Sequence, residues 1–190
     1  MKIAVIGAIA TGKSTIGEML REMGKRVLDC DRLYDEVCAQ SDYIASIERT
    51  FGAVRDGRID RKALGDIVFG DPRRLAQLNA LAHPRIKELL RARTAGDGDW
   101  YVEVSVYVGS GLEGFFDRVI CAHCPIETRV QRLASRGLTR EQALRRIVAQ
   151  TPQETLIALA DDLIDTSASK ETTRARLKEI VQTVDNRAQS

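Results

Sequence analysis

The sequence predicts a three-layer α/β fold, in which a parallel sheet of about five strands carries helices on both faces. Two observations support this prediction. Short apolar runs rich in β-branched residues alternate along the chain with longer segments in which apolar residues recur at helical spacing. The first run leads through a glycine-containing loop directly into a helical pattern, as in the strand–loop–helix units of open α/β sheets.

This first unit carries the most informative motif of the chain. The apolar run Ile3–Ile6 predicts a buried strand, and residues 7–14, GAIATGKS, fit the pattern GxxxxGK[ST]. Apolar residues then recur at i, i+3, i+4 and i+7 of a helix that ends at Gly24: Ile16, Met19, Leu20 and Met23. The alternative is a strand-to-helix turn without a ligand. Because strand, loop and helix follow in the right order, we favour a nucleotide site.

Each part of this loop suits a phosphate group. We expect the backbone N–H groups from Ala10 to Ser14 to point into one concavity, at the positive end of the following helix. Lys13 would place its charge near the β and γ phosphates, and the Ser14 hydroxyl is a suitable ligand for Mg²⁺. The loop therefore predicts binding of a nucleotide together with a magnesium ion.

Composition narrows the range of functions. The 190 residues are 44% hydrophobic, which predicts one domain over residues 1–190 with insertions. With 29 basic and 27 acidic residues the net charge is +2, so we expect neither nucleic acid nor membrane as a partner. No apolar run approaches the roughly 20 residues that span a bilayer, and the chain enters its first strand directly after Lys2. We expect a cytoplasmic enzyme.

The four cysteines offer a sharper hypothesis, which we do not favour. Cys121 and Cys124 have the CxxC spacing of a redox dithiol, and His123 between them could add a zinc ligand. A structural zinc site needs four ligands, however, and the sequence contains no second CxxC or HxxxH. We expect these cysteines to be small apolar residues at the end of a strand, before a helix that Pro125 opens.

A second strand is expected at Arg26–Asp29, and it ends in Asp29-Cys30-Asp31. Carboxylates at the carboxyl end of a parallel strand lie where such sheets bind ligands. Helical spacing then dominates to Ala95, so we expect residues 35–95 to form a helical insertion that receives the second substrate. Two Pro-containing pairs are expected to start helices within it: Asp71-Pro72 and His83-Pro84.

The remaining strands are expected at residues 101–106, 117–121 and 162–165. Between the last two lies a helical stretch in which Arg129, Arg132 and Arg136 form a basic stripe. Such a stripe is often only a solvated face. Beside a phosphate loop, residues 126–150 are better explained as a lid, which Gly137 divides into two helices and in which Thr139 with Gln142 forms a capping box.

Taken together, these motifs resemble the dephospho-CoA kinase family over nearly the whole chain. The resemblance implies a P-loop nucleotide kinase fold with a five-stranded parallel sheet, a helical acceptor region and an arginine-rich lid. The matching pieces in the first half, after the loop, are Asp29-Cys30-Asp31, Phe51-Gly52, residues 56–61, Leu64, Val68-Phe69, Leu78-Asn79 and His83-Pro84. Those in the second half are Arg132-Leu133, Arg136, Arg146-Ile147, Gln150, Ala160-Asp161 and Ile164.

The resemblance implies transfer of the γ-phosphoryl group of ATP to the ribose 3′-hydroxyl of dephospho-CoA, a small-molecule substrate, in a monomer or weak homo-oligomer. The implied catalytic residues are Asp31, Lys13 and Arg136, with help from Arg132 and Arg140. ATP would be bound by Ala10, Thr11, Gly12, Lys13, Ser14, Thr15 and Arg136. Asp31, Arg61 and His83 would contact the acceptor, and Ser14 and Glu103 would hold Mg²⁺.

Several positions depart from the family pattern. Asp35 replaces an arginine, so that attraction for a phosphate would become repulsion. Ser105 and Gly109 replace a proline and a carboxylate, Arg129 replaces a glutamine, and Thr166 replaces an asparagine. These changes leave two alternatives open: a P-loop kinase of another nucleotide or small hydroxyl compound, and a non-catalytic nucleotide-binding switch. The sequence contains neither the NKxD run of a GTPase nor the LSGGQ run of a transporter ATPase.

Overall fold

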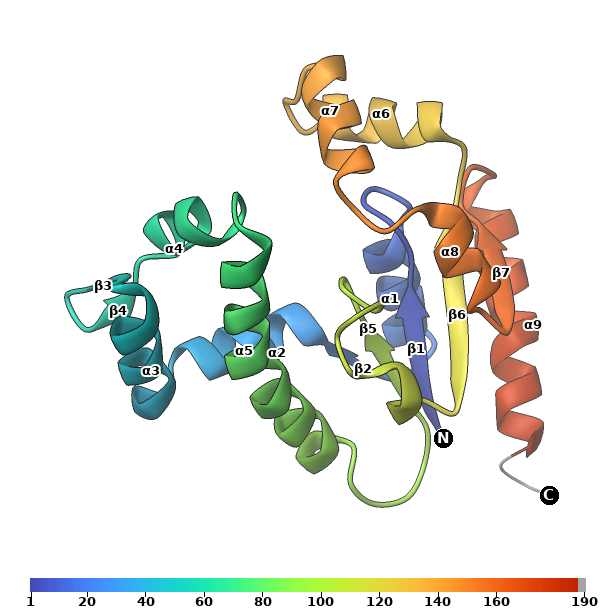
Figure 1. The fold of residues 1–190 in the computed structure, drawn as a ribbon. Helices are drawn as coiled ribbons and strands as arrows, with labels where there is room; N and C mark the ends of the chain where they lie inside the picture. The colour runs from blue at the N-terminus through green and yellow to red at the C-terminus, as the bar shows by residue number, and fades with distance from the viewer. Residues whose placement is uncertain (188–190) are drawn as a thin grey trace. The chain divides into compact units, whose positions relative to one another are not determined.

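The structure is a computed structural model that describes residues 1–187. Two compact units make up the chain (Figure 1). The sheet unit contains Met1–Asp29 and the chain from Gly96 onward, and the helical unit contains Cys30–Ala95. The predicted insertion, residues 35–95, falls within the helical unit. That residues 1–190 act as one domain stays a prediction.

A five-stranded parallel sheet forms the centre of the sheet unit, as predicted. Its strands run in the order β2 (Arg26–Asp29), β5 (Trp100–Glu103), β1 (Lys2–Ile6), β6 (Arg118–His123) and β7 (Asp162–Asp165). In the register, Glu103 lies opposite both Val5 and Asp29. The chain segments that follow β1, β2 and β5 therefore leave the sheet at one edge, where parallel sheets bind ligands.

One predicted strand was too long. The expected strand at residues 101–106 ends at Glu103, although the Val104 N–H still donates to the carbonyl of Val5 at 3.0 Å. The chain then turns away through a loop that Glu113 closes by accepting a hydrogen bond from the Gly109 N–H at 2.6 Å. Val106, which alternation placed in a strand, is 63% exposed because it has no neighbouring strand to pack against.

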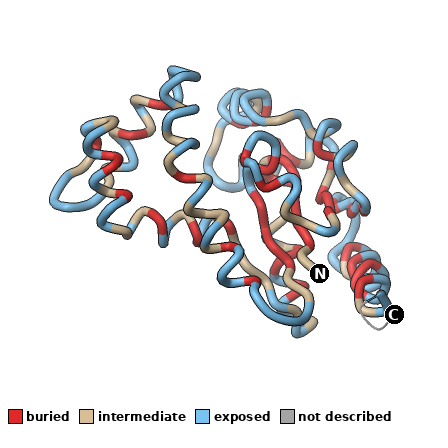
Figure 2. Tube along the Cα trace, turned by 60° about the horizontal axis from the view of Figure 1, so that its bottom comes forward, coloured by how far each residue is buried: buried red, intermediate tan, exposed pale blue. Residues whose placement is uncertain are grey.

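Two long helices cover one face of the sheet. Helix α1 (Lys13–Glu22) and helix α9 (Lys170–Arg187) share a buried core with β1, β5, β6 and β7. This core includes Ile3, Val5, Ile16, Leu20, Tyr101, Ile120, Ile164, Leu177 and Ile180. On β1, Ala4 and Ile6 alternate with these residues and are also fully buried, so both faces of the sheet are covered. Figure 2 shows the buried stretches along these strands.

A helical hairpin forms the predicted lid region. Helix α6 (Ile126–Ala134) and helix α7 (Arg140–Val148) lie beyond the carboxyl ends of β1 and β6 (Figure 1). The capping box of Thr139 and Gln142 at the start of α7 is confirmed. A small apolar core joins this hairpin to the loop after β1, and it contains Ala10, Val130, Leu133, Ala143 and Ile147. After α7, the short helix α8 (Gln153–Ala158) contacts β6 and buries Leu156.

The helical unit has its own core. Its elements are α2 (Cys30–Cys38), α3 (Ser41–Phe51), the hairpin β3 (Val54–Arg55) and β4 (Arg58–Ile59), α4 (Arg61–Val68) and α5 (Pro72–Arg93). Their buried side chains form one cluster that includes Val37, Tyr43, Ile47, Leu64, Val68 and Ala82. The hairpin was not predicted, because strands of two residues carry too little periodicity to be recognised.

His83-Pro84 does not start a helix, contrary to the prediction. Pro84 lies inside α5, whereas Asp71-Pro72 begins that helix as expected, with the Asp71 carboxylate accepting from the N–H groups of Arg73 and Arg74. Proline removes one helical hydrogen bond. The helix continues because Ala82 before Pro84 and Leu90 after it are both buried, so that tertiary packing outweighs the local penalty.

None of the helices in residues 1–187 is long and apolar enough to cross a membrane.

An ion pair between a buried carboxylate and an exposed arginine joins α1 to β5. The Glu103 side chain is 9% exposed, and its Oε1 accepts from Nη2 of Arg21 at 2.9 Å. Gly17 leaves room for this carboxylate, because a Cβ at position 17 would clash with the same oxygen and displace the Glu103 side chain. Burial raises the pKa of Glu103, and the Arg21 guanidinium offsets part of that shift.

Replacing this carboxyl group tests the cost of burying it. Because the pKa of Glu103 is higher in the folded protein, the wild type loses stability as pH rises through that pKa. Glu103→Gln has no such loss, because glutamine does not ionise. The difference between the unfolding free energy of the variant and that of the wild type should therefore increase as the pH rises from below 4.5, the ordinary pKa of glutamate, to neutral pH. Urea unfolding at a series of pH values measures this difference.

The matched control is Glu179→Gln. Glu179 is an exposed glutamate that also pairs with an arginine, Arg176, at 2.9 Å, and it should show no such rise. If the relative stability of Glu103→Gln falls as pH rises, attraction by Arg21 outweighs burial and the assignment is wrong.

Candidate active site

The GAIATGKS loop connects β1 to α1 and has the backbone of a phosphate-binding loop. Gly7 has no room for a side chain, because a Cβ there would lie 2.5 Å from the carbonyl oxygen of Ala122. Gly12, at φ 93°, is the residue before the first turn of α1, where it adopts the left-handed conformation that favours glycine. Since glycine has no side chain to cap α1, the first N–H groups of this helix suit an anion.

Three consecutive carbonyl groups of this loop are held from outside it. The Ile9 oxygen accepts from Nε of Arg129 at 3.0 Å, and the Ala10 oxygen accepts from Nη1 of Arg132 at 3.0 Å. The Thr11 oxygen accepts from the Thr166 hydroxyl at 2.6 Å. In a trans peptide the N–H points away from the C=O. The N–H groups of Ala10 and Gly12 therefore point to the opposite side, toward the interior of the loop.

One N–H of the predicted set has a partner inside the loop. The Thr11 N–H donates to the Ala8 oxygen at 3.3 Å, and the Thr11 hydroxyl donates to the same oxygen at 2.8 Å. The expectation that all N–H groups from Ala10 to Ser14 point into the concavity is therefore wrong for Thr11 in this structure. The reason is a tight turn at Ala8, whose carbonyl oxygen accepts hydrogen bonds from both the N–H and the buried hydroxyl group of Thr11.

Lys13 lies against the loop and bonds to its carbonyl groups. Its Nζ donates to the Gly7 oxygen at 2.6 Å and lies 3.4 Å from the Ala8 oxygen. Ser14 is exposed and Thr15 is half-buried in the first turn of α1. The loop thus presents one ammonium group, a hydroxyl and the positive end of a helix, which together can bind the phosphates of a nucleotide.

The lid arginines do not form a single stripe, contrary to the prediction. Arg129 is 5% exposed and Arg132 also binds the Thr166 oxygen, through Nη2 at 2.5 Å, so both serve the loop. Arg140 pairs with Glu127 through two hydrogen bonds, of 2.8 and 2.9 Å. Arg136 is exposed in the turn between α6 and α7. Arg129 and Arg132 turn inward because the carbonyl groups of the loop need hydrogen-bond donors. Helical spacing in the sequence does not encode this need.

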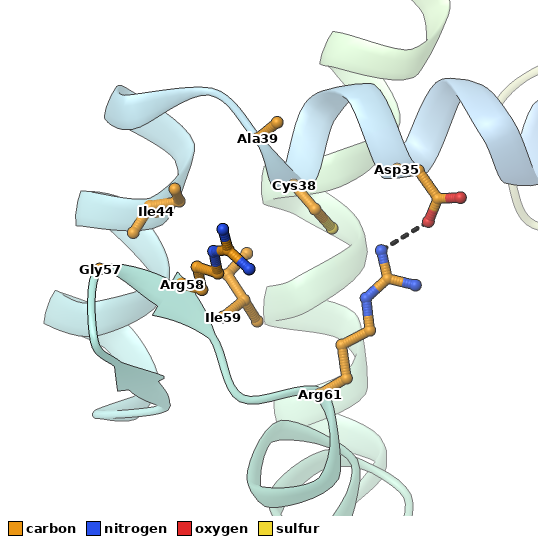
Figure 3. A pocket seen from close by; sticks show the side chains of 8 residues that line it. All are labelled: Asp35, Cys38, Ala39, Ile44, Gly57, Arg58, Ile59 and Arg61. Carbon is orange, nitrogen blue, oxygen red and sulfur yellow. Dashed lines mark hydrogen bonds and ion pairs between the residues drawn. The ribbon is translucent and has the colours of Figure 1, made fainter.

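The predicted residues for the acceptor belong to the helical unit. Asp31 is exposed in the first turn of α2, two residues beyond the end of β2. Arg61, at the start of α4, lines a pocket of about 490 Å³ together with Asp35 and Arg58 (Figure 3). His83 is half-buried in α5 and is not among the residues that line this pocket.

Asp35 and Arg61 point toward each other at one side of this pocket (Figure 3). Asp35 Oδ1 and Arg61 Nη2 are 2.5 Å apart, and the two side chains are 58% and 60% exposed. The Asp35 carboxylate raises the pKa of Arg61. Asp35 thus provides the arginine with a counter-ion. No local sequence pattern pairs the two residues, because Asp35 lies in α2 and Arg61 in α4.

The cysteines are placed as small apolar residues would be. Cys121 is fully buried in β6 and Cys124, which is 1% exposed, follows the strand. Burial raises the pKa of the Cys121 thiol to about 11, which disfavours the thiolate needed for redox chemistry. Within residues 1–187, no three His, Cys, Asp or Glu side chains gather as in a metal site built from such side chains alone, of the kind that holds structural zinc.

Comparisons with known proteins point to one family. A sequence model of the dephospho-CoA kinase family matches residues 1–172. The dephospho-CoA kinase of Carboxydothermus hydrogenoformans is 36% identical over 95% of this chain and 92% of its own length. The crystal structure of TT1252 from Thermus thermophilus is 33% identical, with a TM-score of 0.87 over 96% of each chain. Dephospho-CoA kinase from Campylobacter jejuni is 26% identical, with a TM-score of 0.71 over 97% of this chain and 98% of that one. The chain belongs to the dephospho-CoA kinase family.

Proposed function

We propose that this protein transfers the γ-phosphoryl group of ATP to the 3′-hydroxyl of the dephospho-CoA ribose, which gives CoA and ADP in the final step of CoA synthesis. The proposal rests on the phosphate loop, three of whose carbonyl groups accept hydrogen bonds from side chains outside the loop. The match to the dephospho-CoA kinase family supports it. The family match over residues 1–172 disfavours a kinase of another hydroxyl compound and a non-catalytic nucleotide switch.

The donor half of the reaction takes place at the loop. The N–H groups of Ala10 and Gly12, the start of α1 and the Lys13 ammonium would bind the β and γ phosphates, while Thr15 completes the first turn. For Mg²⁺ we assign the hydroxyl of Ser14 and the carboxylate of Glu103, which are oxygen donors of the kind that this ion prefers. The bound ion would supply positive charge that offsets the negative charge of the phosphate groups.

The acceptor half requires a base for the hydroxyl group. We assign this role to Asp31, whose carboxylate would accept the hydroxyl proton as the oxygen forms its bond to the γ phosphorus. The bond between that phosphorus and the ADP oxygen breaks in the same step, and ADP leaves. Arg136 would neutralise the charge on the transferring group. Arg132 and Arg140, the residues expected to assist, bond to the Ala10 carbonyl and to Glu127, and these bonds would have to open before either arginine could act in this step.

The pocket of the helical unit supports a place for the acceptor. Arg61 and Arg58 supply positive charge at its edge, and the half-buried Cys38 and Ile59 supply apolar surface. We assign Arg61 to an acceptor phosphate, and His83 remains the second predicted acceptor contact. A cytoplasmic location and a monomer or weak homo-oligomer complete the proposal.

The activity is tested with a panel of acceptors. ADP release, coupled to a spectroscopic readout, should be stimulated strongly by dephospho-CoA in the presence of ATP and Mg²⁺, with CoA identified as the product by mass spectrometry. Adenosine, shikimate and pantetheine serve as comparison hydroxyl compounds and should give little stimulation. Strong stimulation by one of them, and none by dephospho-CoA, would remove the assigned acceptor and keep the kinase.

A second prediction concerns the base. Asp31→Asn should lower kcat about 10²-fold or more, because the amide cannot accept the hydroxyl proton, and should leave the Kd for ATP near the wild-type value. Asp66→Asn, at an exposed position on α4, is the matched control and should keep wild-type kcat. Weaker ATP binding with unchanged kcat in Asp31→Asn would identify Asp31 as a structural residue instead.

A third prediction concerns the counter-ion of Arg61. Asp35→Asn should lower the KM for dephospho-CoA severalfold, because the acceptor no longer competes with a carboxylate 2.5 Å from Arg61. Arg61→Met should raise the same KM, and neither change should alter the KM for ATP.

The control for this pair is Glu36→Gln on the same helix. Glu36 forms a comparable surface ion pair with Arg93 at 2.7 Å and does not line the pocket, so its loss should leave both KM values unchanged. A higher KM for dephospho-CoA in Asp35→Asn would show that Asp35 orients Arg61 for binding rather than competing with the acceptor.

A further inference from the structure

Arg129 is a buried cation behind the phosphate loop. Only 5% of this residue is exposed, although arginine is among the residues least often fully buried. Its Nε donates to the Ile9 carbonyl at 3.0 Å. Within residues 1–187, its guanidinium forms no ion pair with a carboxylate, whereas Arg140 of the same hairpin pairs with Glu127.

A buried charge without a counter-ion is unfavourable unless something nearby compensates it. Burial lowers the pKa of Arg129, and attraction by Cys124 and by the Glu154 carboxylate offsets only part of that shift. The compensating group should be an anion, and the phosphate loop is the element that Arg129 touches. An arginine placed here raises the positive potential on the phosphate side of the loop, in surroundings where water screens it weakly.

The loop is also fixed mechanically at this point. Ile9 is held at both ends, since its N–H donates to Oε1 of Gln150 at 2.9 Å and its carbonyl accepts from Arg129 at 3.0 Å. The trans peptide that follows turns the Ala10 N–H away from Arg129, toward the interior of the loop. Arg129 therefore acts on the phosphate site through a single peptide group.

We propose that Arg129 is a positioning residue that also acts as a fixed counter-charge for the nucleotide, so that the affinity of the loop rises with the number of phosphate charges it binds. The proposal rests on the proposed function only in that the loop binds ATP. It predicts that Arg129 contributes more to binding of ATP than of ADP.

The side chain of glutamine can separate the two roles. The amide nitrogen of glutamine lies the same number of bonds from Cα as Nε of arginine. Arg129→Gln therefore retains a donor for the Ile9 carbonyl and removes the charge, while Arg129→Met removes both. Glutamine is also the residue that the family pattern has at this position, so the variant is expected to fold.

Calorimetric titration of the full chain with ATP and with ADP, each with Mg²⁺, tests the proposal. Arg129→Gln should raise the Kd for ATP about tenfold and the Kd for ADP clearly less, because the lost charge acts on fewer phosphate charges. Arg129→Lys, which keeps the charge, should retain the wild-type ratio of the two Kd values. Raising the salt concentration should leave the effect of Arg129→Gln largely in place, because a buried charge is weakly screened.

Two controls accompany these variants. Thr166→Val removes the hydroxyl that donates to the Thr11 carbonyl at 2.6 Å without a change of charge, so it should weaken ATP and ADP binding by the same factor. Arg145→Gln removes an exposed arginine of α7 that pairs with Glu141 at 3.0 Å, and it should change neither Kd.

Equal weakening of ATP and ADP binding in Arg129→Gln would overturn the counter-charge role and leave only the hydrogen bond. Unchanged binding of both nucleotides, or loss of the wild-type ratio in Arg129→Lys, would overturn the proposal. A wild-type protein that binds ATP but does not phosphorylate dephospho-CoA would contradict the proposed function instead, so the two failures can be distinguished.

Discussion

The structure of the active site depends on how the carbonyl groups of the phosphate loop are satisfied. A loop that turns its N–H groups toward phosphates must turn its C=O groups away from them, where they need donors. Arg132 meets this need at Ala10 and, through Thr166, links the loop to the end of β7. The lid hairpin, the loop and the sheet edge are thereby joined by hydrogen bonds among groups that are distant in the sequence.

The same requirement explains two departures from the family pattern. Arg129 and Thr166 both donate to loop carbonyls, so these replacements form contacts that support the nucleotide site. In the helical unit, the departure at Asp35 is accompanied by its ion pair with Arg61. Ser105 and Gly109 lie in the exposed loop after β5, where the Gly109 N–H is bound by the Glu113 carboxylate. We therefore interpret the departures as a local rearrangement of partners within an intact kinase.

Helices and strands whose apolar residues recur at a regular spacing could be predicted from the sequence, and those without such a regular spacing could not. The strands β1, β2, β6 and β7 and the helix α1 follow from apolar runs and helical spacing. The strand predicted at residues 101–106 ends at Glu103, because the alternation of apolar and polar residues continues past Glu103 into a loop. Helix α5 was divided at Pro84, since the burial of Ala82 and Leu90 that sustains it depends on neighbouring helices.

The sequence by itself determined the phosphate loop, its lysine and the family, because these depend on short runs of neighbouring residues. It also placed Asp31 directly after a strand. Only the tertiary structure decided which arginines serve the loop and which stay exposed, and that Arg61 already has a counter-ion. The bond from Arg129 to Ile9 joins residues 120 positions apart, and no local pattern encodes such a contact. Such partners come together only in the folded protein, where buried carbonyl groups and charges need hydrogen-bond or ion-pair partners.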